Sequence, residues 1–116
     1  MSYVLRKKNR TLIIQVTGEL DLVTANNFRE TVDATMQEMM AKNLIIDLAR
    51  VNFIDSSGLG VILGRFRKIS AQGGKLVLIG LTPNVQRILE LSGILSFIPY
   101  CDDELKAWQL LEKKVI

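Results

Sequence analysis

Histidine is absent from this 116-residue chain, and Cys101 is its only cysteine. These two shortages exclude a disulfide within the chain, zinc sites built from Cys and His, and Ser-His-Asp or Cys-His catalysis. No apolar run approaches the roughly 18 residues that a membrane-spanning helix needs. Basic residues at positions 6–8 precede any long apolar stretch, unlike in a signal peptide. We therefore expect a cytoplasmic protein with no metal, no cofactor and no membrane contact.

The chain also lacks a strong charge of one sign. Its 15 Lys and Arg residues outnumber 12 acidic residues by only three, and they are spread along the whole chain. The densest basic cluster, at positions 65, 67 and 68, is interrupted by Phe66 and Ile69 at helical spacing. This pattern is typical of the solvent-facing side of an amphipathic helix. It does not predict direct binding of nucleic acid, which needs a concentrated basic face.

Hydrophobic residues make up 48% of the sequence, enough for one domain over residues 1–116 to build its own core. Apolar periodicity and turn signals predict alternating strands and helices. Strands are expected at 3–8, 11–16, 44–48, 75–80 and 97–100, with helices beginning at Thr24, near Ser57, at Thr82 and at Asp102, the last with three acids (102–104) in its first turn. The second helix should stop at Gly73 and Gly74, and the third at Gly93.

This order predicts an α/β fold with a small, mostly parallel sheet and an N-terminal edge strand. Helical crossovers make successive strands parallel, so the turns at 18–24, 51–58 and 80–84 should meet at one sheet edge. Open α/β sheets place their sites at that edge. The residues that we expect to gather there are Glu19, Asp21, Asp55, Ser56, Ser57 and Thr82.

Two interpretations remain open for the junction where the second helix begins. Asp55, Ser56 and Ser57 are all good N-cap residues, and most serines in such a position serve only as caps. A hydroxyl at a helix N-terminus is also a place where free amides and the helix dipole would stabilise an added phosphate. Asp21 leaves a similar choice, because it could contact a partner or serve as a turn or N-cap residue.

An enzyme is less well supported by these residues. Gly58, Gly60 and Gly64 only approximate a dinucleotide loop, because the third glycine of the usual pattern would fall at Leu63. No phosphate loop with its lysine is present. A serine nucleophile would lack a base. The alternative that we keep is a small nucleotide-binding α/β protein that uses Gly58 and Gly60, which should bind a nucleotide without a partner.

A longer pattern surrounds this junction. The run Phe53-Ile54-Asp55-Ser56-Ser57-Gly58-Leu59-Gly60-Val61-Ile62-Leu63-Gly64-Arg65 follows Gly18-Glu19-Leu20-Asp21 and precedes Gly73-Gly74. This combination resembles the STAS-domain anti-sigma factor antagonists, including those that act in sporulation. The resemblance extends over essentially the whole chain in length and element order, and it implies a STAS fold.

The resemblance also implies a regulatory switch rather than an enzyme. Members of the family bind an anti-sigma factor that is also a serine kinase, which brings its own ATP and magnesium, and this binding frees a sigma factor. The kinase phosphorylates the serine after the motif aspartate, which is Ser56 here, and a serine phosphatase reverses the modification. Ser57 is then a cap. The expected partner-binding residues are Glu19, Asp21, Asp55, Ser56, Ser57, Gly58, Leu59 and Thr82.

Overall fold

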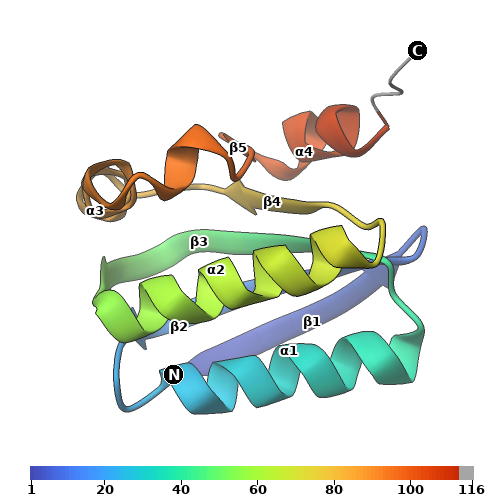
Figure 1. Cartoon of the computed structure of the whole chain (residues 1–116), viewed down its shortest axis with the longest axis horizontal. Coiled ribbons are helices and arrows are strands. Elements are labelled where there is room, and N and C mark those ends of the chain that lie inside the picture. Colours follow the sequence, from blue (N-terminus) through green and yellow to red (C-terminus); the bar gives the residue numbers. More distant parts are fainter. Residues whose placement is uncertain (113–116) are drawn as a thin grey trace.

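The strand and helix alternation expected from the sequence is present in the computed structural model, which describes residues 1–112 (Figure 1). Residues 113–116 of the expected domain lie outside the described residues. The elements are β1 (Ser2–Lys8), β2 (Thr11–Leu20), α1 (Ala25–Met39), β3 (Asn43–Ile54), α2 (Ser56–Ala71), β4 (Leu76–Ile79), α3 (Pro83–Ser92), the 3₁₀ turn η1 (Ile94–Ser96), β5 (Tyr100–Cys101) and α4 (Glu104–Leu111).

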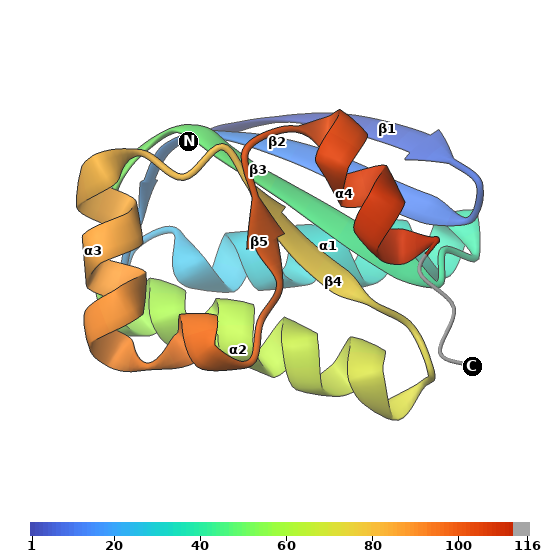
Figure 2. The same ribbon diagram turned by 90° about the horizontal axis from the view of Figure 1, so that it is seen from above.

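The strands form one sheet in the order β1-β2-β3-β4-β5. The first two form an antiparallel hairpin, and every later neighbour is parallel, because each later strand is reached through a connection that contains a helix. Both the mostly parallel α/β sheet and the N-terminal edge strand predicted from the sequence are thus confirmed. The carboxyl ends of β2 and β3 and the start of α2 lie at the same end of the molecule (Figure 2).

Two hydrophobic layers cover the sheet. The larger layer lies between the sheet and α1, α2 and α3, and its fully buried side chains include Phe28, Ile62 and Leu89. The smaller layer lies on the opposite face, where Ala107 and the half-buried Trp108 of α4 pack on the sheet. Figures 1 and 2 show α1 and α2 on one side and α4 on the other. No helix within residues 1–112 is long and apolar enough to cross a membrane.

Two strands are longer than the sequence predicted. We expected β2 to end at Val16 and the central strand at Leu48, but they continue to Leu20 and Ile54. Their added length is paired, with Leu20 opposite Ile54, across two register irregularities. Gly18, which we interpreted as a break, adopts a φ of 120° that favours glycine and lets the strand continue through the irregular pairing.

The C-terminal part also differs in detail. The last strand was expected at 97–100 but lies at Tyr100–Cys101, where these two residues pair with Leu78 and Ile79 of β4. The last helix begins at Glu104 rather than at Asp102, because the extended backbone of Asp103 makes it the N-cap. The predicted helix ends are confirmed: α2 stops just before Gln72 and the two glycines, and Gly93 caps α3 with a φ of 83°. These helices therefore end where the local glycine signals indicated.

Candidate functional site

The carboxylate of Asp55 joins the two loops at the carboxyl end of the sheet. One oxygen, Oδ1, accepts hydrogen bonds from the backbone amides of Ser57 at 2.8 Å and Gly58 at 3.1 Å, so Asp55 is the N-cap of α2. The other oxygen, Oδ2, accepts from the amide of Leu22 at 3.0 Å, in the loop between β2 and α1. Asp55 thus fixes the start of α2 and the neighbouring loop relative to each other.

The two serines after Asp55 lie in different environments. Ser56 is the first residue of α2 and is exposed, and its hydroxyl makes no hydrogen bond with any residue in 1–112. Ser57 is half-buried, and its amide is held by Asp55. The cap of this helix is therefore the aspartate, and the Ser56 hydroxyl remains accessible to another molecule.

At Gly58 the first turn of α2 lies directly against the end of β2. This glycine is buried, and a Cβ atom built on it would lie 2.2 Å from the carbonyl oxygen of Leu20 and 2.9 Å from Cγ2 of Ile54. A glycine is needed here because the chain's own strand fills the space of a side chain. A Cβ built on Gly60 would meet nothing within 4 Å. Gly58 is thus required for the contact with Leu20 of the same chain. In a nucleotide loop the glycines instead let the backbone approach a phosphate, so this contact disfavours the nucleotide-binding alternative.

The loop between β2 and α1 is held by its own polar side chains. Oδ1 of Asp21 accepts from the amides of Val23 at 3.0 Å and Thr24 at 3.1 Å, while the Asp21 amide donates to Oγ1 of Thr24 at 3.0 Å. The Thr24 hydroxyl lies 2.8 Å from the carbonyl oxygen of Glu19, to which it donates. Asp21 therefore acts as a turn residue, the second of the two roles considered for it. Whether it also contacts a partner stays a prediction.

This turn exposes apolar side chains that the sequence interpretation missed. Leu22 is 76% exposed and Val23 is 87% exposed, directly beside the helix start that Asp55 ties to them. Phe53, two residues before Asp55, is 42% exposed. The sequence signal for this exposed patch was the pair of adjacent apolar residues in an otherwise polar turn. Exposed apolar side chains that do not pack in a core often mark an interaction surface. We call Leu22, Val23 and Ser56, which lie on the two segments that the hydrogen bonds of Asp55 hold together, the candidate docking surface, or docking surface for short.

Thr82 reaches the same end of the sheet from α3. It occupies the N-cap position of that helix, where the sequence predicted the helix to begin, but its side chain makes no capping hydrogen bond. Its hydroxyl instead donates to the carbonyl oxygen of Val51 at 3.0 Å, and the side-chain amide of Asn84 donates to the carbonyl of Asn52 at 2.7 Å. Thr82 and Asn84 can make these bonds because β3 continues beyond Leu48, which brings the carbonyl groups of its added residues within reach of the start of α3.

The structure thus brings the expected residues to one edge with unequal accessibility. Ser56 and Glu19 are exposed, Asp21, Asp55, Ser57, Leu59 and Thr82 are half-buried, and Gly58 is buried. Within residues 1–112, no group of three or more His, Cys, Asp or Glu side chains could hold a metal ion. The chemistry available at this edge is an accessible hydroxyl at a helix N-terminus, which can accept a group that another protein transfers.

Comparisons with known proteins agree with this architecture. The model of the STAS domain family matches residues 2–107. The anti-sigma F factor antagonist of Paenibacillus polymyxa is 38% identical over 101 residues, which cover 87% of this chain and 86% of that protein. Among solved structures, a candidate anti-sigma factor antagonist from Thermotoga maritima has a TM-score of 0.90 at 23% identity, covering 96% of this chain and 95% of that one. The Bacillus cell fate determinant SpoIIAA in its phosphorylated form has a TM-score of 0.72 at 24% identity, covering 94% and 99%.

Proposed function

The chain belongs to the STAS domain family, and we propose that it is an anti-sigma factor antagonist, a protein-binding module rather than an enzyme. The name of its Paenibacillus polymyxa relative supports this proposal over most of the length of both chains. In this role the protein binds an anti-sigma factor and thereby releases the sigma factor, which activates transcription. We extend the proposal to a sporulation sigma factor because that relative is an anti-sigma F factor antagonist. We also propose that the protein acts in the cytoplasm.

The observation that carries the proposed switch is the exposed hydroxyl of Ser56. We propose that an anti-sigma factor with serine kinase activity phosphorylates this hydroxyl, supplying ATP, magnesium and the catalytic base itself. The bare hydroxyl fits such a role because Asp55 already caps α2, so Ser56 is not needed to hold the helix. A serine phosphatase would restore the free hydroxyl. The phosphorylated form of SpoIIAA is a fold relative with this kind of modification.

A phosphate on Ser56 would act on the docking surface rather than on the fold. It adds about −1.5 to −2 charges and three acceptor oxygens at a helix N-terminus, where a negative charge is tolerated. The same charge would stand among the exposed side chains of Leu22 and Val23, which a partner would otherwise cover with apolar atoms. Desolvating a dianion in such an interface is costly. A coupling of about 3 kcal/mol would change partner affinity by more than a hundredfold.

The binding step is tested by titration calorimetry with the purified anti-sigma factor. We expect Ser56→Asp to weaken binding while its melting temperature stays close to that of the wild type, because an acid at the helix start is tolerated. Ser56→Ala should bind as the wild type does. Ser70→Asp is a matched control, because Ser70 is exposed near the other end of α2. Equal affinity of Ser56→Asp and wild type would show that negative charge at Ser56 does not control binding.

A further inference from the structure

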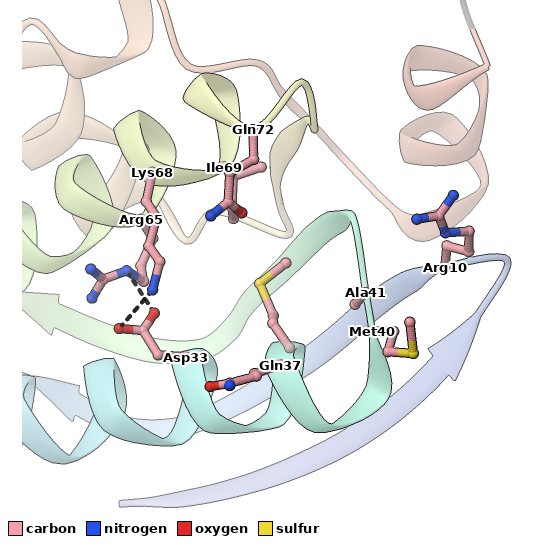
Figure 3. A pocket seen from close by; sticks show the side chains of 10 residues that line it. Arg10, Asp33, Gln37, Met40, Ala41, Arg65, Lys68, Ile69 and Gln72 are labelled. Carbon is pink, nitrogen blue, oxygen red and sulfur yellow. Dashed lines mark ion pairs between the residues drawn. The ribbon is translucent and has the colours of Figure 1, made fainter.

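A groove between the C-terminal halves of α1 and α2 lies at the far end of α2 from Ser56 (Figure 3). Its volume is about 510 Å³. Arg65 lies nine positions after Ser56, which corresponds to about 14 Å along the helix. The groove is thus separate from the docking surface. Its walls include Arg10, Asp33, Met36, Arg65, Lys68 and Ile69.

Positive charge exceeds negative charge in this groove. Within the described part of the chain, Asp33 is the only acidic residue that lines it, and its two oxygens pair with two cations, Nε of Arg65 at 3.1 Å and Nζ of Lys68 at 3.6 Å. The Arg65 side chain is only 11% exposed. Its Nε and Nη1 atoms are buried; Nε lies in the ion pair with Asp33, whereas Nη1 makes neither a hydrogen bond nor an ion pair with residues 1–112. A buried guanidinium nitrogen without an acceptor favours a bound acceptor, because an unsatisfied donor is costly.

Arg10 supplies a further cation from a different element. It lies in the turn between β1 and β2, and its carbonyl oxygen accepts from the amides of Lys42 at 2.7 Å and Asn43 at 3.1 Å. These bonds fix the turn against the segment that follows α1. Figure 3 shows Arg10 at one end of the groove and the Asp33, Arg65 and Lys68 cluster at the other. Three cations against one carboxylate leave a net charge of +2.

Apolar side chains form part of the groove between its two ends. Ile69 is buried, with 3% of its surface exposed, and Met36 of α1 is half-buried, while Gln37 and Gln72 add polar groups beside them. The exposed Met40, directly after α1, lies at the Arg10 end (Figure 3). Methionine thioethers are flexible and adapt their shape to an apolar ligand. Apolar walls with a few charged groups at fixed positions are typical of small-molecule sites. Such walls would contact the body of a ligand whose charged group reaches the cations.

We propose that this groove binds a small organic anion, with a phosphate or carboxylate group held by the cations at one of its two ends and an apolar body against Ile69 and Met36. Lys68 is half exposed, so its ammonium group can reach a ligand in the groove while Asp33 keeps Arg65 in place. The site uses no residue of the docking surface. Its occupancy can therefore be measured without a partner protein and independently of any phosphorylation of Ser56.

The test is a titration of the ¹⁵N-labelled protein followed by NMR. Phenyl phosphate and benzoate represent the two kinds of organic anion, inorganic phosphate supplies the charge alone, and benzyl alcohol supplies the apolar ring alone. We expect at least one organic anion to shift the amides of 33–41 and 65–72 saturably at millimolar concentration. Inorganic phosphate and benzyl alcohol should each bind about tenfold more weakly. Tighter binding of phenyl phosphate and tighter binding of benzoate would both support the proposal. The tighter ligand would identify whether the groove prefers a phosphate or a carboxylate group.

Variants decide whether the groove cations are responsible. The double variant Arg10→Gln/Lys68→Gln should weaken binding of the organic anion about tenfold while leaving the buried pair of Arg65 and Asp33 intact. Arg67→Gln removes one charge from the same helix at an exposed position that does not line the groove, and it should bind as the wild type does. Absence of saturable shifts would overturn the proposal. So would equal binding by the wild type and the double variant.

Discussion

Replacing Gly58 by alanine should destabilise the protein through a single steric contact. The new methyl carbon would lie 2.2 Å from the carbonyl oxygen of Leu20, and backbone atoms cannot move aside as the end of a flexible side chain can. The start of α2 must then shift away from β2. Forcing an extra carbon into a packed site costs about 1–3 kcal/mol or more, partly offset by up to about 1 kcal/mol from the better helix propensity of alanine.

A net loss of about 2 kcal/mol translates into a clear thermal shift. For 116 residues the entropy of unfolding is about 0.24 kcal/mol/K, so Gly58→Ala should lower the melting temperature by about 8 °C. Gly60→Ala is the matched control, because a Cβ there meets no atom within 4 Å. The control should keep or raise the melting temperature, by up to about 4 °C. Calorimetry on both variants tests the reasoning, and equal melting temperatures would refute it.

Three other perturbations have expected outcomes. Asp21→Ala should lower the free energy of unfolding by about 1 kcal/mol because the turn loses its acceptor, whereas Asp21→Asn keeps an acceptor and should remain stable in denaturant titrations. Truncating both Leu22 and Val23 to alanine should weaken anti-sigma factor binding by at least about tenfold, with little change in melting temperature, and unaltered calorimetric affinity would remove them from the docking surface. Burial raises the pKa of Glu104, but hydrogen bonding and charge from Arg6 outweigh burial, and the pKa is lowered overall. The ionised Glu104 carboxylate therefore stabilises the fold at neutral pH. This contribution is lost as the pH falls through the pKa of the folded state. Glu104→Gln should therefore lower the melting temperature at pH 7 by a few degrees, and the difference should close in acid; a constant difference would contradict this assignment.

The topology and helix ends could be predicted because their signals are local. Glycines at 73, 74 and 93 mark helix ends, and the strand and helix alternation favours parallel pairing. The added length of β2 and β3 could not be predicted, because it depends on pairing between Leu20 and Ile54 across an irregular register. A one-dimensional pattern does not specify such a register shift.

The meeting of the candidate residues at one sheet edge could be predicted from the sequence, but the contacts that hold them there could not. Asp55 was expected near Asp21, yet its bond to the Leu22 amide joins residues 33 positions apart and follows only from the fold. Gly58 was expected in partner binding, while its neighbours in space show a packing requirement that no sequence pattern reveals. The exposure of Leu22 and Val23 likewise depends on how Asp55 holds their turn.

The central claim is that Ser56 is the single phosphate acceptor, and mass spectrometry measures this most directly. Wild type, Ser56→Ala and Ser57→Ala would each be incubated with the purified anti-sigma factor, ATP and magnesium, and phosphopeptides from the start of α2 would be mapped. The exposed, unbonded hydroxyl of Ser56 predicts one phosphate in wild type and in Ser57→Ala, and none in Ser56→Ala. A phosphate mapped to Ser57, or one retained by Ser56→Ala, would contradict the account.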